Sequence, residues 1–394
     1  MAAGIMGGTD VSNVVPKPMT LRKLLFVVNV DWAFICHRLP VGLGAIAEGY
    51  EVHLATTCTT RADELMRYGF IVHPLQIDRG SINPFNALHT FFSILRLFLK
   101  IKPDLVHLVT IKPVIFGGIA ARIARVPAVV SAIPGLGFAF TDKGVKARIG
   151  RAVAIMLYRM AVRHRNFKAI FQNPDDRQLI TGWTGLHFNQ TEMIRGSGVD
   201  LNVYRCRPLP EGVPVALMAT RLLKTKGVLE FVDAVKVLRA RGIEAEFWIA
   251  AAIDENNPAY IGQAQLNQWA AEYGIKLFLN HTAIQELMAQ CHVVVLPSYR
   301  EGVPKVLLEA AACGRAVLTT DVPGCRDAIT PGGTGLLVPA KSVIPLADAM
   351  GLILKGRALQ LRLGSSGRAL AEAEFGIEQV VAKHLRIYEA LIGG

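Results

Sequence analysis

Short runs of apolar, often β-branched residues alternate along the chain with longer segments whose apolar positions recur at helical spacing. This alternation is typical of βα units and of parallel sheets. Six runs fall in the first half and six in the second. They are residues 24–30, 51–55, 71–75, 105–109, 128–132 and 169–172, then 215–219, 246–250, 277–279, 293–296, 316–319 and 335–338. We therefore predict an α/β protein with two Rossmann-like domains of six parallel strands each.

A proline-rich stretch separates the two sets of runs. Residues 200–214 contain Pro208, Pro210 and Pro214 and few apolar residues, as is typical of a linker. We place an N-terminal domain at residues 21–199. The other predicted segments are a C-terminal domain at 215–376, a helix at 345–363 within it, and a final helix at 377–394. Parallel sheets that face each other bind ligands at the carboxyl ends of their strands, so we expect the chemistry in a central cleft.

Composition excludes several classes of protein. With 394 residues, 52% of them hydrophobic and 19% charged, the chain has ample apolar surface for two cores, which excludes a mostly disordered protein. Residues 1–20 lack the basic start and apolar run of a signal peptide, and we predict a disordered lead. The six cysteines form no CxxC pair, which argues against a zinc or disulfide framework and favours the cytoplasm. The apolar segment 85–101 contains His89, Arg96 and Lys100, which argues against a spanning helix.

Positive charge is concentrated in the first half. The net charge is +12, and residues 1–200 hold 23 Lys and Arg against 13 Asp and Glu. Residues 143–168 contain eight basic residues, no acid and many interleaved apolar residues, which predicts a basic amphipathic helix. We expect it to dock on an anionic membrane surface, the alternative being a core-packed helix with a solvated basic face. Nucleic acid is not expected, because no binding motif accompanies the charge. The predicted membrane-docking residues are Lys143, Lys146, Arg148, Arg151, Arg159 and Arg163.

The most informative segment for chemistry follows the strand at 293–296. A turn contains Glu301 and Gly302, and a helix with Pro304 near its start carries Glu309. Free backbone N–H groups at a helix start favour an anion. The two glutamates lie about 12 Å apart along a helical rise, so one carboxylate could meet a sugar and the other a ribose, with a diphosphate between them.

This segment resembles the Glu-x7-Glu motif of the retaining family 4 glycosyltransferases. The similarity extends over roughly residues 24–391 and is greatest to bacterial enzymes that transfer an N-acetylhexosamine to a polyprenyl-diphosphate-linked sugar. The other matching stretches are residues 38–40, 78–80, 103–113, 135–137, 172–176, 196–200 and 221–227. The resemblance implies the two-domain GT-B fold, with a UDP-sugar as co-substrate and with neither a metal nor another cofactor.

The resemblance also implies roles for individual residues. Arg221 and Lys226 would hold the donor diphosphate, and Glu301 would hold the donor sugar. Attack would occur on the front face with retention, and the leaving phosphate would help to take the acceptor proton, so that no side-chain nucleophile is required. A cation can neutralise charge that develops on a leaving diphosphate. The implied donor-binding residues are Glu309, which would grip the ribose, and Ser298, Gly302, Val303, Pro304 and Lys305.

Five residues of the first half are candidates for the acceptor side. For His107 a satisfied core histidine is an equally good interpretation. A polyprenyl-linked acceptor would place the enzyme at the inner face of the cell membrane as a peripheral protein. The five candidates are His37, Arg38, Arg79, His107 and Lys112.

Some positions depart from the family pattern. Residues 249–252, Ile-Ala-Ala-Ala, stand where the family usually has Val-Gly after the second strand of the donor domain, which leaves the donor sugar open. Two alternatives also stay open. One is a GT-B enzyme that acts on a soluble acceptor or is a nucleotide-sugar epimerase, and the other is a non-catalytic, membrane-bound ligand-binding protein.

Overall fold

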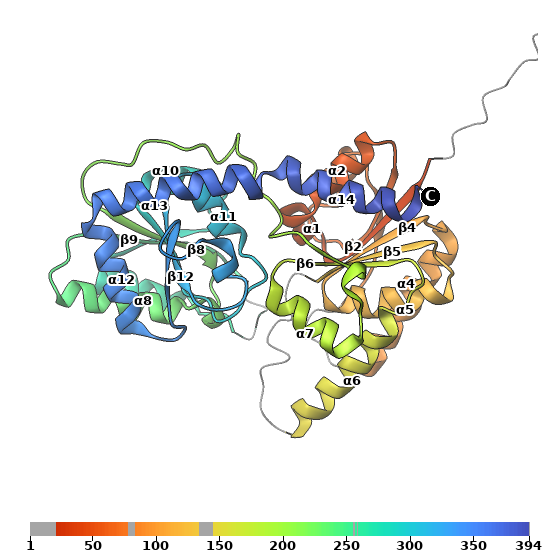
Figure 1. The fold of residues 1–394 in the computed structure, drawn as a ribbon. Coiled ribbons are helices and arrows are strands. Elements are labelled where there is room, and N and C mark those ends of the chain that lie inside the picture. The colour runs from red at the N-terminus through yellow and green to blue at the C-terminus, as the bar shows by residue number, and fades with distance from the viewer. Residues whose placement is uncertain (1–20, 78–82, 134–144, 255–256, 258, 394) are drawn as a thin grey trace, which may run out of the picture.

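The computed structural model describes residues 21–77, 83–133, 145–254, 257 and 259–393. Within them the chain forms two α/β domains joined side by side (Figure 1). Every pair of neighbouring strands in both sheets is parallel. The predicted fold class is confirmed.

The N-terminal sheet has seven strands in the order β3-β2-β1-β4-β5-β6-β7. The prediction of six strands was wrong by one, because β7 has only three residues and pairs with β6 alone. The strand consists of a threonine, a glutamate and a methionine, so it contains no run of apolar residues. The strands are β1 Lys23–Val30, β2 Glu51–Thr57, β3 Ile71–Pro74, β4 Leu105–Val109, β5 Ala128–Ile133, β6 Phe167–Phe171 and β7 Thr191–Met193.

The C-terminal sheet has six strands in the order β10-β9-β8-β11-β12-β13. All six predicted runs form these strands. They are β8 Val215–Arg221, β9 Glu246–Ala252, β10 Ile275–Leu279, β11 Val293–Leu296, β12 Ala316–Thr320 and β13 Gly335–Val338.

Helices connect the strands and cover both faces of each sheet. The N-terminal ones are α1 Asp31–His37, α2 Leu39–Ala47, α3 Ala62–Arg67, α4 Pro84–Ile101, η1 Pro113–Gly117, α5 Gly118–Ile123, α6 Val145–Ala161, α7 Pro174–Thr184 and η3 Phe188–Gln190. Those that follow are η4 Lys224–Lys226, α8 Val228–Ala240, α9 Gln263–Tyr273, α10 Ile284–Gln290, α11 Lys305–Ala312, η5 Arg326–Ala328, α12 Val343–Lys355, α13 Arg357–Leu370, η6 Ala371–Phe375 and α14 Ile377–Ile392.

The predicted single helix over 345–363 is instead two helices. α12 ends at Lys355 and α13 begins at Arg357, because Gly356 leaves the helical conformation at φ −101° and ψ 79°. The apolar positions continue across the break, so their spacing gave no sign of it. Glycine costs a helix interior about 1 kcal/mol relative to alanine, which makes it a natural place to break.

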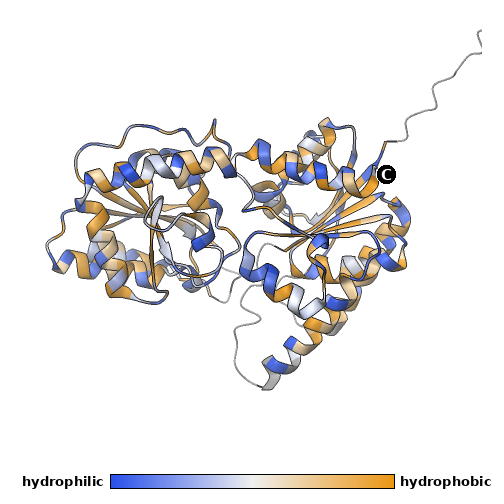
Figure 2. Ribbon diagram, viewed as in Figure 1, coloured by the Kyte–Doolittle hydropathy of each residue, from blue (hydrophilic) through white to orange (hydrophobic). Residues whose placement is uncertain are grey.

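Apolar side chains fill the space between each sheet and its helices. Figure 2 shows that hydrophobic residues predominate along the strands of both sheets. One face of the N-terminal sheet packs against α4, α5 and α6. The opposite face packs against α1, α2 and the last helix, α14, which contributes Val380, Ile387 and Tyr388. A parallel sheet buried on both faces explains why its strands appear as nearly continuous apolar runs.

The chain crosses between the domains twice, and the two crossings are bonded to each other. Val199 N donates to Phe375 O at 2.9 Å, and Ile377 N donates to Val199 O at 3.0 Å. The first crossing leads into residues 200–214, and the second carries α14 back over the N-terminal domain (Figure 1). The C-terminal segment is therefore part of the N-terminal core.

Candidate active site

A cleft of about 430 Å³ lies between the two domains. Its walls include the residues that follow the carboxyl ends of β1, β4 and β6 in one domain, and of β8 and β11 in the other. This is the place where open parallel sheets bind ligands. The cleft brings together nine of the predicted site residues: His37, Arg38, Arg221, Lys226, Glu301, Gly302, Val303, Pro304 and Lys305.

Two cations and a carboxylate project from the C-terminal wall. Arg221 is the last residue of β8, and its Nη1 lies 3.1 Å from Oδ2 of Asp254. Lys226 ends η4, and its Nζ forms an ion pair with Oε1 of Glu301. Both cations thus reach the cleft already paired with a carboxylate. A bound dianion would compete with these carboxylates for the same donors.

The turn that carries Glu301 is held by close backbone packing. Glu301 N donates to Pro323 O at 3.1 Å. A Cβ atom on Gly324, whose φ is +83°, would lie 1.8 Å from Gly302 O, so this position requires glycine. Gly227, which follows Lys226, similarly brings its backbone against Pro297 O. The loops that carry Lys226 and Glu301 are therefore packed as rigid neighbours.

Two predicted donor-binding residues lie behind the cleft wall. Glu309, on α11, is 8% exposed, lies 3.4 Å from Lys305 Nζ and accepts a hydrogen bond from the Tyr204 hydroxyl. Burial, together with the neighbouring Glu309 carboxylate, raises the pKa of Tyr204 well above its ordinary value. Ser298 is fully buried, and its hydroxyl has no partner.

His37 is a histidine of the N-terminal domain that lines the cleft and could exchange a proton with a ligand. It ends α1, faces the cleft, and its Nδ1 lies 3.1 Å from Ser197 Oγ. Desolvation between the cleft walls, with the positive charges of Arg38, Lys305, Arg221 and Lys226, lowers the pKa of His37 to about 3, although the residue remains exposed at the mouth of the open cleft. The ring is therefore neutral at pH 7 and offers one nitrogen as a donor and the other as an acceptor.

Arg38 is a buried cation at the junction of α1 and α2. It is 2% exposed, and its Nη1 donates to His37 O at 2.8 Å. Burial lowers the pKa of Arg38 to about 10, so it keeps its charge at pH 7. It adds to the positive potential of the N-terminal wall.

Two of the remaining acceptor-side candidates, His107 and Lys112, are not among the residues that line the cleft. His107 is fully buried on β4, bonds the Tyr388 hydroxyl through Nδ1 and stacks on His384 with ring centroids 5.7 Å apart. It is packed as a core histidine, which is the alternative that the sequence left open. Lys112, at the turn after β4, is not among the residues that line the cleft. Arg79 lies outside the described residues.

Several cleft residues were assigned no individual role from the sequence, although Thr110, Gln172 and Ser197 lie in stretches that match the family. They share a position at or just after a strand end, which was the available signal: Asn29, Trp32, Thr110, Gln172 and Ser197. Among the residues that the structure describes, no group of three or more His, Cys, Asp or Glu could hold a metal ion.

The predicted basic helix corresponds to α6. Arg148 is exposed on the helix, and Arg163 is exposed just after it. Arg151 is half-buried, and Arg159 Nε donates to Trp183 O at 2.6 Å. Lys143 lies outside the described residues, and the Lys146 side chain is not described. α6 also exposes Val153, Met156 and Met160.

The exposed apolar surface continues from α6 onto the helices beside it. α5 contacts both α4 and α6 on the same face of the sheet. α4 exposes Phe85, Leu88 and Phe92, and α5 exposes Ile123. Within the described part of the chain, no helix has the length and hydrophobicity that crossing a bilayer requires.

Comparison with known proteins gives matches over most of the chain. Residues 205–370 match the family model of glycosyl transferases group 1, and residues 23–173 match that of glycosyl transferase 4-like domains. The N,N'-diacetylbacillosaminyl-diphospho-undecaprenol alpha-1,3-N-acetylgalactosaminyltransferase of Campylobacter jejuni is 30% identical over 385 residues, covering 94% of this chain and 99% of that protein. The capsular polysaccharide biosynthesis glycosyltransferase CapM of Staphylococcus aureus is 23% identical, with 93% and 96% covered.

Solved structures share the fold at low sequence identity. The sucrose-phosphate synthase of Thermosynechococcus elongatus superposes with a TM-score of 0.76 at 19% identity, covering 94% of this chain and 99% of that one. Anabaena Alr3699/HepE, solved in complex with UDP, superposes with a TM-score of 0.74 at 16% identity, covering 94% and 100%.

Proposed function

The chain belongs to the group 1 glycosyl transferases, and from this premise we propose that it transfers an N-acetylhexosamine, with retention, from a UDP-sugar to a sugar carried on a polyprenyl diphosphate. The observation that carries the proposal is the meeting of Arg221, Lys226 and Glu301 in one cleft. The acceptor class is supported by the 30% identical relative, whose name describes a diphospho-undecaprenol acceptor.

Arg221 and Lys226 hold the donor diphosphate in this proposal. The diphosphate oxygens replace Asp254 and Glu301 as acceptors of their N–H groups. Negative charge grows on the leaving UDP as the glycosidic bond breaks, so fixed cations at this position stabilise the transition state more than the ground state.

Glu301 and Glu309 hold the two sugars of the donor. Exchange of Lys226 onto phosphate frees the Glu301 carboxylate to accept hydrogen bonds from hydroxyls of the transferred sugar. Glu309 lies on α11 next to Lys305, and its carboxylate accepts from the ribose hydroxyls. Backbone N–H groups at the start of α11 add a favourable potential for the diphosphate between them.

The reaction is balanced without a side-chain nucleophile. The bond between the sugar C1 and the phosphate oxygen breaks, and a bond from C1 to the acceptor oxygen forms on the same face. The acceptor proton passes to the leaving phosphate oxygen. Neutral His37 and its partner Ser197 lie on the opposite wall, where they orient the acceptor hydroxyl by hydrogen bonds. We propose no metal, because the side chains of Arg221, Lys226 and Lys305 supply the positive charge, and unchanged turnover in EDTA is the expected result.

The acceptor is delivered at a membrane surface in this proposal. The apolar residues that α6 exposes, Val153, Met156 and Met160, lie in sequence between the exposed basic residues Arg148 and Arg163. Such a surface suits the interface of an anionic bilayer. The enzyme would then be peripheral at the inner face of the cell membrane.

A donor screen with a polyprenyl-diphosphate-linked sugar tests the proposal. We expect UDP release and a lipid-linked product with one UDP-N-acetylhexosamine, and loss of both in the Glu301→Gln variant. Equal turnover on a water-soluble sugar would favour the soluble-acceptor alternative. Absence of UDP release with every donor would contradict the proposal.

A further inference from the structure

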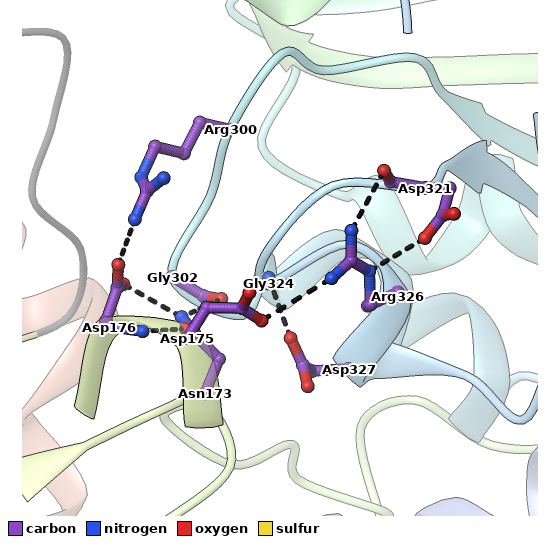
Figure 3. A network of polar contacts seen from close by, with 9 residues as sticks. All are labelled: Asn173, Asp175, Asp176, Arg300, Gly302, Asp321, Gly324, Arg326 and Asp327. Carbon is purple, nitrogen blue, oxygen red and sulfur yellow. Dashed lines mark hydrogen bonds and ion pairs between the residues drawn. The ribbon is translucent and has the colours of Figure 1, made fainter. Parts of the chain in front are cut away.

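The turn that carries Glu301 is bonded to the opposite domain. Figure 3 shows Arg300 and Gly302 facing Asn173 and Asp176, which come from the junction of β6 and α7. Asn173 Nδ2 donates to Gly302 O at 3.2 Å, and Arg300 Nη2 donates to Asp176 Oδ1. Gln172, which precedes Asn173, also bonds to this turn, because Val303 N donates to Gln172 Oε1 at 3.0 Å.

These contacts bracket Glu301 on both sides. Arg300 precedes it, and Gly302 and Val303 follow it, and each of the three is bonded to the N-terminal domain. The partners are buried: Asn173 and Asp176 are 0% exposed and Gln172 is 6% exposed. Buried polar groups are costly in free energy unless they are paired. These hydrogen bonds therefore strongly favour the relative position of the two domains in this structure.

A neighbouring contact crosses the same interface without touching the turn. Arg326 lies 3.5 Å from Asp175 and 2.7 Å from Asp321, on a loop next to the turn (Figure 3). Asp321 is exposed, and Arg326 and Asp175 are partly exposed. Exposed ion pairs contribute little to stability. Arg326 and Asp175 therefore provide a matched comparison for Arg300 and Asp176.

We propose that Gln172, Asn173 and Asp176 are positioning residues, through which the N-terminal domain sets the Glu301 turn for the donor sugar. This inference rests on the proposed role of Glu301 in holding that sugar. The donor site is then completed only when the acceptor domain lies against it. UDP, which Arg221 and Lys226 hold from the C-terminal domain, needs none of these contacts.

Gln172 separates positioning from folding better than its neighbours. Asn173 caps α7, accepting from Asp176 N at 2.8 Å and donating to Asp176 Oδ2 at 2.9 Å, so its loss would also weaken that helix. Among the residues that the structure describes, the Gln172 side chain takes part in one hydrogen bond, which it accepts from Val303 N across the domains. Gln172→Leu removes the acceptor at nearly constant volume, and Gln172→Glu retains an oxygen there.

The experiment compares Gln172→Leu with Gln172→Glu and with Gln360→Leu. Gln360 is equally buried, but it bonds Ile353 O and Leu354 O inside the C-terminal domain. For Gln172→Leu we expect kcat at saturating donor to fall at least tenfold, because small misplacements of a binding group carry large kinetic costs. The Kd for UDP should change less than twofold. Gln172→Glu should recover most of kcat, and Gln360→Leu should lower Tm but keep kcat.

A second readout does not depend on turnover. Amide hydrogen exchange of residues 299–304 should be faster in Gln172→Leu than in the wild type, and unchanged in Gln360→Leu. In the turnover assay, Arg300→Met should lower kcat at least tenfold, and its comparison variant Arg326→Met should lower kcat less than twofold. Unchanged exchange together with unchanged kcat in Gln172→Leu would overturn the inference. A wild-type protein that transfers from no donor would contradict the proposed function alone, and the exchange result would then decide the positioning.

Discussion

At the scale of single residues, two cations of the cleft already form ion pairs with carboxylates. Arg221 is paired with Asp254, and Lys226 with Glu301. Each pair keeps a donor oriented in the absence of ligand, so little reorganisation is needed when a diphosphate replaces the carboxylate. Preorganised donors of this kind contribute most where charge develops during reaction.

Removal of either cation should impair donor use. For Arg221→Ala and Lys226→Ala we expect kcat/KM for the UDP-sugar to fall about 100-fold, the usual effect of removing one such donor. Lys224→Ala is a matched control, because Lys224 lies on the same short helix but is exposed and outside the cleft. Steady-state UDP release checks this. Near-normal kcat/KM in both cleft variants would contradict the donor assignment.

A buried histidine predicts how stability depends on pH. Burial, followed by the charge of Arg38, lowers the pKa of His384 to about 3, and His107, Arg38 and Tyr388 face it. Below about pH 6.5 the unfolded chain binds a proton there and the folded chain does not, so the free energy of unfolding falls as pH drops toward 3. The slope is about 1.4 kcal/mol per pH unit for one histidine.

Denaturant unfolding between pH 7.5 and 5 measures that slope. His384→Phe should reduce it by about one proton, whereas His187→Gln, which alters an exposed histidine, should leave it unchanged. Equal slopes in the wild type and in His384→Phe would show that His384 is protonated in the folded protein.

At the scale of elements, α6 combines two roles on its two sides. Tyr158 and Ala161 are buried in the N-terminal core, whereas Met156 and Met160 remain exposed beside basic residues. The sequence left open whether the helix packs in the core or meets a membrane, and the structure places one side in the core and leaves the other free. The exposed side is where we propose membrane contact.

Vesicle flotation tests the proposed contact of α6. Reversal of three exposed or partly exposed charges, Arg148→Glu, Arg159→Glu and Arg163→Glu, should reduce binding to anionic vesicles at least tenfold, since each basic residue near such a surface contributes about 1 kcal/mol. The control reverses Lys355, Arg357 and Arg362, which are exposed on the other domain. Equal binding of the wild type to neutral and anionic vesicles would contradict electrostatic docking.

At the scale of the whole molecule, the last helix ties the two domains together. α14 follows the C-terminal domain in sequence but buries Val380, Ile387 and Tyr388 against the N-terminal sheet. Tyr388 also bonds His107 in that core. The N-terminal domain therefore depends on residues more than 350 positions away from β1.

Removal of α14 should prevent folding of the N-terminal domain. Truncation after Gly376 exposes the surface that three fully or nearly buried side chains cover, each contributing about 1.5–3 kcal/mol. Their sum is comparable with the total stability of about 5–15 kcal/mol. We expect insoluble protein, measured as the soluble fraction after expression, whereas truncation of residues 393–394 should be neutral. A soluble, cooperatively melting truncated protein would contradict this view.

The sequence by itself determined the alternation of strands and helices, the parallel α/β class and the segment that carries Glu301 and Glu309. These features are local, because the apolar runs of buried strands and the apolar spacing of helices involve residues that are neighbours in the sequence. It missed β7, whose three residues carry no periodic signal, and the break at Gly356, where the apolar spacing continues.

Only the tertiary structure decided which charged residues meet. His37 and Arg38, at the end of α1, line the cleft, whereas His107, within β4, is fully buried, although the sequence made all three candidates for the acceptor side. Strand order and the return of α14 fix these positions, and both depend on contacts between residues far apart in the chain. The bonds from Gln172 and Asn173 to the Glu301 turn form across two domains, so no local pattern could have indicated them.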